Sequence, residues 1–291
     1  MKFGVMFANA GPFAFPEYLE ILARIAEESG FESIWTVEHV LIPLGYHSRY
    51  PYNPSGRLPG PESAPIADPL LPLAFAAAVT KKLRLGTAVV ILPQRHPAYV
   101  AKEMATLDIL SGGRAMLGIG IGWLKEEFDA VGVPFTERAE RTDESIQAIR
   151  SLWKPAPEPF EGRFYKWGPV ESNPKPLQQP GVPIIIGGHS PGAARRAARH
   201  GDGFFPITED PQVLSSLLAI LRDECEKVGR DPNAIEISTG SVHIDDSVDF
   251  DTARRAQDAG VGRLVIAPPA YDPEGLRTGL QQFAERVIAR F

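Results

Sequence analysis

Short apolar runs rich in valine, isoleucine and phenylalanine alternate eight times along the chain with longer segments of helical period. This alternation predicts parallel β-α units, because a parallel strand needs a crossover, usually a helix, before its neighbour. Eight such units in one chain predict an α/β fold of the (β/α)8 TIM-barrel type. The predicted strands are Lys2–Ala8, Phe31–Thr36, Arg84–Ile91, Ala115–Ile121, Val182–Gly187, Gly203–Ile207, Ile235–Val242 and Arg263–Ala267.

Segments of helical period follow each predicted strand. Proline, aspartate or serine stands at the start of most of these segments, and glycine follows the last turn of several. The predicted helices run from Pro16 to Gly30, Asp68 to about Lys82, Pro97 to Leu110, Leu124 to Trp153 with a break near Gly132–Pro134, Pro191 to His200, Pro211 to Gly229, Phe250 to Gly260, and from Pro273 onward. A doubly wound sheet is the competing fold, but the turn after the first strand lacks its glycine fingerprint.

The length of 291 residues is compatible with two domains, yet single barrels often reach it. We therefore expect a single domain over residues 1–291, with insertions after strand two, about residues 40–66, and before strand five, about residues 155–182. The second insertion is rich in proline, which opposes both helix and central strand. Within it, Phe160–Trp167 is expected to form a small hairpin.

Composition excludes several classes of function. The formal net charge of −6 provides no basic field, so we expect no nucleic-acid partner. The longest apolar run, Leu70 to Val79, is far shorter than the roughly 20 residues of a membrane span, and the apolar start of the chain is too short for a signal peptide. Cys225 is the only cysteine, so an intrachain disulfide and a cysteine metal cluster are excluded, and helical spacing predicts that it packs inside. A cytoplasmic protein without membrane contact is expected.

In a barrel, the chemistry lies at the carboxyl ends of the strands. His39, which follows strand two, is the best candidate for an acid, a base or a hydrogen-bond donor, and Glu38 stands beside it. No two histidines have the spacing of a metal site, so no metal is expected. No second carboxylate completes a glycosidase pair with Glu38.

Two glycine-rich strand ends allow more than one interpretation. Gly187-Gly188-His189-Ser190 leads into a helix, and it is either an anion site built from backbone amides or a tight turn in which Ser190 caps the helix. Gly118, Gly120 and Gly122 do not have the spacing of a dinucleotide fingerprint. We interpret them as clearing space for a flat ring.

With these motifs in this order, the sequence resembles the bacterial luciferase-like monooxygenase superfamily, and within it the coenzyme F420-dependent oxidoreductases of actinobacteria. The matching motifs are Gly30–Trp35 with Glu38-His39, Leu85-Gly86-Thr87, Pro97 with Ala101-Lys102, Ala105–Asp108 with Leu110–Arg114, Leu117–Trp123, Arg141–Glu144, Asn173–Pro176, Ile185–Gly188 and Ala197–Gly203. They span nearly the whole chain.

The resemblance implies a flavin-type ring across strands two to four, its phosphate near Gly187 and Gly188, and a non-proline cis peptide at Ala88-Val89 in a strand-three bulge. The implied catalytic residues are His39 and Glu38, with His39 acting on the ring or substrate rather than holding the fold. The implied cofactor-binding residues are Thr87, Ala88, Val89, Gly120, Gly122, Trp123, Gly187, Gly188 and Ser190.

The leading hypothesis is a coenzyme F420-dependent oxidoreductase that transfers a hydride to or from a small organic substrate, and we expect a homodimer. The alternatives are a monooxygenase that uses reduced FMN and oxygen, and a barrel that only binds a flavin-like ligand. The family's sugar-phosphate dehydrogenases have a carboxylate and a tryptophan where this chain has Trp123 and Pro43, so glucose-6-phosphate oxidation is not expected. The tyrosine-rich loop from Leu41 to Pro65 either selects an aromatic or acidic substrate or is simply covering surface.

Overall fold

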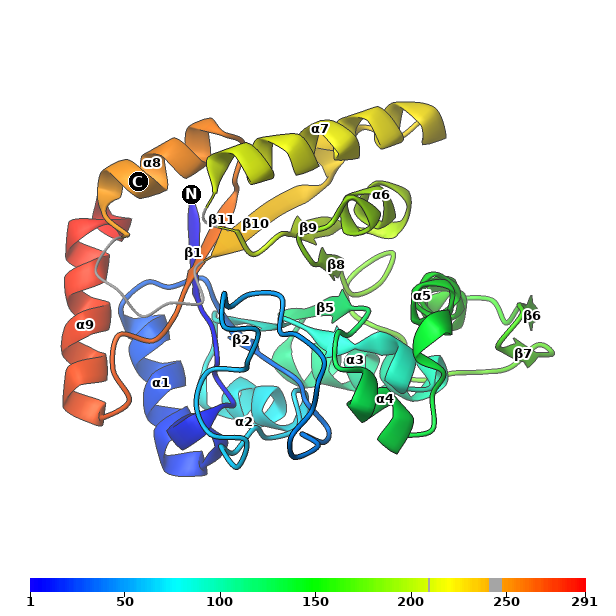
Figure 1. Cartoon of the computed structure of the whole chain (residues 1–291), viewed down its shortest axis with the longest axis horizontal. Coiled ribbons are helices and arrows are strands. Elements are labelled where there is room, and N and C mark those ends of the chain that lie inside the picture. Colours follow the sequence, from blue (N-terminus) through cyan, green and yellow to red (C-terminus); the bar gives the residue numbers. More distant parts are fainter. Residues whose placement is uncertain (209, 241–247) are drawn as a thin grey trace.

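Eight parallel strands close into a barrel in the computed structural model of the chain, which describes residues 1–208, 210–240 and 248–291 (Figure 1). The hydrogen-bonded order is β3-β2-β1-β11-β10-β9-β8-β5, and pairing of β5 with β3 closes the ring. In register, Phe3 on β1 faces Leu264 on β11, and Thr36 on β2 faces Thr87 on β3. The (β/α)8 barrel predicted from the alternation is confirmed.

The barrel strands occur where they were predicted, but most are shorter. Their bounds are β1 Lys2–Val5, β2 Ser33–Thr36, β3 Arg84–Thr87, β4 Val90–Ile91, β5 Ala115–Gly120, β8 Ile184–Gly187, β9 Gly203–Phe205, β10 Glu236–Gly240 and β11 Arg263–Ile266. The predicted strand Arg84–Ile91 is interrupted at Ala88 and Val89, whose peptide bond is cis as the resemblance implied. Its second part, β4, still pairs with β5. The last two residues of the predicted strand Ile235–Val242 lie outside the described residues.

The helices lie outside the strands (Figure 1). Their bounds are α1 Pro16–Glu28, α2 Leu71–Val79, α3 Pro97–Ser111, α4 Lys125–Ala130, α5 Arg138–Trp153, α6 Pro191–His200, α7 Pro211–Val228, α8 Phe250–Asp258 and α9 Pro273–Arg286. Helix α2 begins three residues after the predicted Asp68, because the Asp68 carboxylate accepts the N–H groups of Leu70 and Leu71 ahead of the first turn. Cys225 is fully buried on α7, as predicted.

The proline-rich insertion contains the predicted hairpin. Strands β6 (Phe160–Glu161) and β7 (Lys166–Trp167) pair antiparallel, and the rings of Phe160 and Trp167 stack with centroids 5.1 Å apart. Its cross-strand aromatic pair is of the kind that stabilises short ladders.

The inside of the barrel is filled by Trp35, which is fully buried. A Cβ atom at Gly4 or Gly86, on the two neighbouring strands, would lie within 2.7 Å of the Trp35 side chain. These two glycines therefore give the indole its space. Met6, Met116 and other residues from around the barrel complete this inner cluster.

Arg263 closes the barrel at the amino-terminal end of β11 and is also fully buried. Its guanidinium makes two hydrogen bonds of 2.9 Å to the carboxylate of Glu32, one of 3.1 Å to Ser238, and an ion pair of 2.7 Å with Glu236. A buried cation of this kind is tolerated only when its donors are satisfied. We call Arg263 with Glu32 and Glu236 the ionic floor, because this group lies at the end of the barrel opposite His39.

Within the described residues, the structure contains no helix that combines the length and the apolar character needed to cross a bilayer.

Candidate functional site

The carboxyl ends of β2, β5 and β8 bring together segments that lie far apart in the sequence. His39 follows β2, Trp123 follows β5 and His189 follows β8. The rings of His39 and Trp123 meet edge to face with centroids 5.6 Å apart, and two tyrosines connect Trp123 to His189. The strand ends singled out in the sequence therefore share one end of the barrel.

The end of β2 is fixed by a buried amide. The side chain of Asn9, which follows β1, donates hydrogen bonds to the carbonyls of Val37 at 2.8 Å and Ala67 at 2.6 Å, and accepts one from the Val37 N–H. A buried amide with these bonds satisfied is rigid, because any shift leaves a polar group unpaired. Asn9 thus sets the direction in which the chain leaves β2 toward His39.

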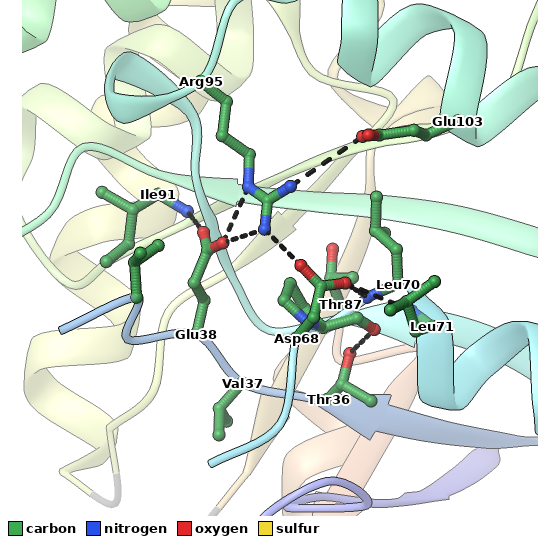
Figure 2. Close-up of polar contacts among 12 residues, drawn as sticks. Thr36, Val37, Glu38, Asp68, Leu70, Leu71, Thr87, Ile91, Arg95 and Glu103 are labelled. Carbon is green, nitrogen blue, oxygen red and sulfur yellow. Dashed lines mark hydrogen bonds and ion pairs between the residues drawn. The ribbon is translucent and has the colours of Figure 1, made fainter. Parts of the chain in front are cut away.

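Glu38 is enclosed in a network with Arg95, as Figure 2 shows. One carboxylate oxygen accepts from Nε of Arg95 at 2.7 Å, and the other accepts from the N–H of Ile91 on β4 at 2.5 Å. Arg95 also donates to Asp68 at 2.7 Å, which links β2 to the start of α2. Burial outweighs the Arg95 charge and raises the pKa of Glu38.

These contacts place Glu38 behind the site. Its carboxylate is directed at Arg95 and the backbone of β4 (Figure 2), and it fixes the end of β2 on which His39 stands. This arrangement differs from the direct catalytic part predicted for Glu38. It indicates a positioning residue.

His39 is held by a carboxylate that the sequence interpretation missed. Its Nδ1 lies 2.9 Å from Oε2 of Glu127 on α4, and the Glu127 side chain is fully buried. The other oxygen of Glu127 accepts the N–H groups of Val40 at 2.7 Å and Leu41 at 3.2 Å. Nδ1 is therefore engaged with a carboxyl group, and Nε2 is the ring nitrogen left for a ligand.

His39 therefore has a structural contact at Nδ1 and a second ring nitrogen, Nε2, that binds none of the described residues. The prediction that it acts on a ligand rather than holding the fold needs this correction, because removing the imidazole takes one partner from a buried carboxylate. Glu127 carried one signal in the sequence. It stands three residues after Leu124 and next to Phe128, on the face of α4 that those two buried side chains define.

Aromatic side chains cross the site from one strand end to the other. We use the name aromatic row for the five rings in contact order. Its members are His39, Trp123, Tyr50, Tyr52 and His189. The centroid separations are 5.6, 5.3, 5.4 and 4.7 Å, and ring pairs at such distances attract one another beyond simple burial.

The two tyrosines of the aromatic row come from the segment of residues 41–65, between β2 and α2, which loops out beside the strand ends (Figure 1). Glu126 on α4 anchors this segment by accepting the Ser48 hydroxyl at 2.6 Å and the N–H groups of His47 and Ser48. Although burial raises the pKa of Glu126, these hydrogen bonds outweigh it and hold the pKa at about 2. The anchor is therefore ionised at neutral pH.

The predicted cofactor residues at the ends of β3, β5 and β8 are packed against other protein groups. The side chain of Val89 stands between the two strands β5 and β8, because a Cβ at Gly120 or Gly187 would lie 2.6 or 2.5 Å from it. A Cβ at Gly122 would collide with Phe128 and Ile91. Gly120 and Gly122 thus make room for protein side chains, which differs from the interpretation that Gly118, Gly120 and Gly122 clear space for a flat ring.

Thr87 and Ala88 are the two predicted cofactor residues that precede Val89. Both are buried, and the Thr87 hydroxyl donates to the carbonyl of Gly118 at 2.6 Å. Val89, Gly122 and Trp123 are the partly exposed members of the predicted cofactor set from this region, and of these only Val89 and Trp123 have side chains. Any ligand at this end of the barrel would therefore meet these two side chains before the buried ones.

The start of α6 combines both interpretations of its sequence. The Gly188 N–H donates to the carbonyl of Phe205 at 3.2 Å, so it belongs to the barrel and not to an anion site. Ser190 caps α6, because its hydroxyl accepts the Ala193 N–H at 3.2 Å. Yet Nδ1 of His189 is buried and has no hydrogen-bond partner among the described residues. A buried polar atom without a partner points to a group that binds there.

Comparison with known proteins identifies the family. The profile described as luciferase-like monooxygenase matches residues 1–275. An uncharacterized protein of Mycobacterium tuberculosis is 34% identical over 277 residues, which cover 92% of this chain and 94% of the relative. The resemblance stated from the sequence motifs is thereby confirmed.

Two relatives have named activities. An F420-dependent glucose-6-phosphate dehydrogenase of Kineococcus radiotolerans is 35% identical over 253 residues, covering 85% of this chain and 68% of the relative. An FMNH2-dependent dimethylsulfone monooxygenase of Pseudomonas putida is 35% identical over 231 residues, covering 78% of this chain and 58% of the relative. Together with the closed parallel barrel and the residues gathered at its strand ends, these matches show that the chain belongs to the luciferase-like monooxygenase family of oxidoreductases.

Proposed function

We propose that this protein is a coenzyme F420-dependent oxidoreductase that transfers a hydride to or from a small organic molecule. The observation that carries the proposal is the His39–Glu127 pair beside Trp123 at the strand ends. The match to the F420-dependent relative also extends over more of this chain than the match to the FMNH2-dependent one. When bound, the deazaflavin ring supplies the hydride chemistry, and the protein orients the partners.

The residues present fit such a cofactor at the start of α6. His189 offers a buried ring nitrogen without a partner in the described part of the chain, and the helix N-terminus behind it favours negative charge. We assign the polar end of the cofactor to this place. Val89 and Trp123 are the side chains that would face its ring.

His39 has the geometry to handle a proton at the substrate. The bond from Nδ1 to Glu127 fixes the ring, so Nε2 can donate or accept a proton where charge develops during hydride transfer. Glu38 and Arg95 would act only through the position of β2. Trp123 and Pro43, which replace the family's carboxylate and tryptophan, speak against glucose-6-phosphate as the substrate.

Cofactor choice is tested by equilibrium dialysis of the purified protein against F420 and FMN, read by the absorbance of the free cofactor. We expect F420 to bind at least about tenfold more tightly than FMN, and His189→Ala to weaken F420 binding by about tenfold while Tm stays unchanged. His47→Ala is the matched control, since that side chain is exposed. Tight binding of FMN with none of F420 would favour the second candidate, an FMN-dependent monooxygenase.

We also propose that the protein is a homodimer. Leu71 and Phe75 are exposed on α2, and Tyr99 and Leu110 are exposed on one face of the neighbouring α3. Leu71 is 73% exposed and Tyr99 71%, which is unusual for large apolar side chains gathered in one area. Light scattering after size exclusion should give twice the 31.7 kDa of one chain, and Leu71→Lys with Tyr99→Lys should give one chain's mass. A single-chain mass for the unaltered protein would refute the dimer.

A further inference from the structure

Two tyrosine hydroxyls at the site have no hydrogen-bond partner in the described part of the chain. The Tyr46 hydroxyl accepts the N–H of Leu58 at 2.9 Å and so stabilises the 41–65 segment itself. The hydroxyls of Tyr50 and Tyr52 have no hydrogen-bond partner among residues 1–208, 210–240 and 248–291. Burial raises the pKa of both, to about 12 for Tyr52, so both remain protonated donors at neutral pH.

The segment that carries them is built to hold them in place. The Arg57 guanidinium donates to the carbonyl of Tyr46 at 2.5 Å and lies 4.0 Å from the centre of its ring. Glu126 fixes the segment to α4 through Ser48. A donor with a fixed direction loses little entropy when a ligand binds, which is how binding sites achieve selectivity.

Three cations near the aromatic row are already engaged. Arg57 pairs with Glu62 at 2.8 Å, Lys125 pairs with Asp129 at 2.5 Å, and Arg95 belongs to the carboxylate network of Figure 2. An anionic ligand would find none of these groups available. A carboxylate or phosphate left without a cation in a partly dry site costs more than a neutral acceptor does.

Two carboxylates near the aromatic row disfavour binding of an anion. Glu127 places a buried carboxylate directly behind His39, and Glu126 places an ionised one behind the 41–65 segment. Arg49, also in that segment, has no ion pair among the described residues, but it is exposed to solvent and lies beside Gly56. The charges that are buried or anchored beside the row are therefore negative, and they favour an uncharged ligand.

Building on the proposed function, we propose that Tyr50 and Tyr52 form the substrate side of the site and select an uncharged aromatic molecule that carries a hydrogen-bond acceptor. Val89 packs beside β5 and β8, the part of the barrel that the proposed function assigns to the cofactor, while the two tyrosines come from the 41–65 segment and contact Trp123 and His189. A flat ring enters the aromatic row by edge or face contact, and a tyrosine hydroxyl donates to its acceptor.

The experiment measures the Kd of three matched probes for the F420-loaded protein by isothermal titration calorimetry. Naphthalene-2-carboxamide is uncharged and aromatic, 2-naphthoate is its anionic counterpart, and decahydronaphthalene-2-carboxamide is its saturated counterpart. We expect the first probe to bind at least about tenfold more tightly than either of the others.

Variants assign the selectivity to the two tyrosines. Tyr50→Leu and Tyr52→Leu should each weaken binding of the aromatic amide by about tenfold, and Tyr50→Phe and Tyr52→Phe should weaken it less, because the ring stays and only the hydroxyl is lost. The F420 Kd and Tm should stay within a few-fold and a few degrees of the unaltered protein, respectively. Tyr18→Leu, at an exposed position on α1, is the control and should change nothing.

The possible results separate the two proposals. Absence of F420 binding in the dialysis overturns the proposed function and this inference together. If F420 binds but the anionic or the saturated probe binds as tightly as the aromatic amide, only the inference fails. It also fails if no probe binds, or if the leucine variants bind the aromatic amide as the unaltered protein does while retaining its Tm.

Discussion

Replacing His39 with alanine should lower kcat by about 10²-fold once a substrate is in hand, because a preorganised donor at the reacting group is worth roughly that much. The F420 Kd should change only several-fold. The His39 imidazole is bound to Glu127 on α4 and makes no contact with the residues assigned to the polar end of the cofactor. The variant should fold, because Glu127 keeps the N–H groups of Val40 and Leu41 and loses one hydrogen bond of about 1–3 kcal/mol. Steady-state kinetics give the change in kcat, and denaturant unfolding gives the change in the free energy of unfolding.

Two substitutions on α4 test whether the effect on kcat depends on the contact between His39 and Glu127. Glu127→Gln keeps the shape of the side chain, but one amide oxygen must replace two carboxylate oxygens, so it should lower kcat about tenfold with little change in KM. Asp129→Asn is the same chemical change at an exposed position of the same helix and should leave kcat unaltered. If His39→Ala or Glu127→Gln folds and retains full kcat, the proton-handling role of this pair is wrong.

Replacing Arg263 with alanine should destabilise the protein by about 3–5 kcal/mol, the usual cost of breaking a buried ion pair from one side. The change leaves Glu32 without its ion-pair partner and leaves Glu236 with Lys2 alone. Burial raises the pKa of both groups, but Arg263 outweighs burial and lowers each below the ordinary 4.5. Urea unfolding at pH 7 measures the loss.

The pH dependence of that loss has a definite sign. A carboxylate whose pKa is lowered by folding stabilises the protein above its ordinary pKa, and this contribution disappears as the pH falls through the folded value. Without Arg263, burial is opposed less and the folded pKa of both carboxyls rises, so the loss should be full at pH 7 and shrink as the pH falls through these pKa values. Arg277→Ala, which removes an exposed pair with Glu28, should cost less than about 1 kcal/mol at any pH. If Arg263→Ala lowers the free energy of unfolding by less than about 1 kcal/mol, the claim that the ionic floor stabilises the barrel is wrong.

Elements whose signals are local could be predicted from the sequence. Helix α6 begins and ends at Pro191 and His200 as predicted, because a serine cap, a first-turn proline and a following glycine all act within a few residues of each end. The Phe160–Trp167 hairpin has the same kind of local origin. The end of strand one was predicted less well: the strand was expected to reach Ala8 but ends at Val5, because Phe7 takes a positive φ of 63° that no regular strand contains.

The sequence by itself determined the barrel, the family and the end of the barrel where the site lies, because periodicity and motif order are properties of the chain alone. Only the tertiary structure decided which side chains meet there. Glu127 reaches His39 across 88 positions of sequence, and Val89 occupies the space beside Gly120 and Gly187. Such contacts depend on how strands and loops from distant parts of the chain are placed in three dimensions, and the pattern of one segment carries no information about its partner's position.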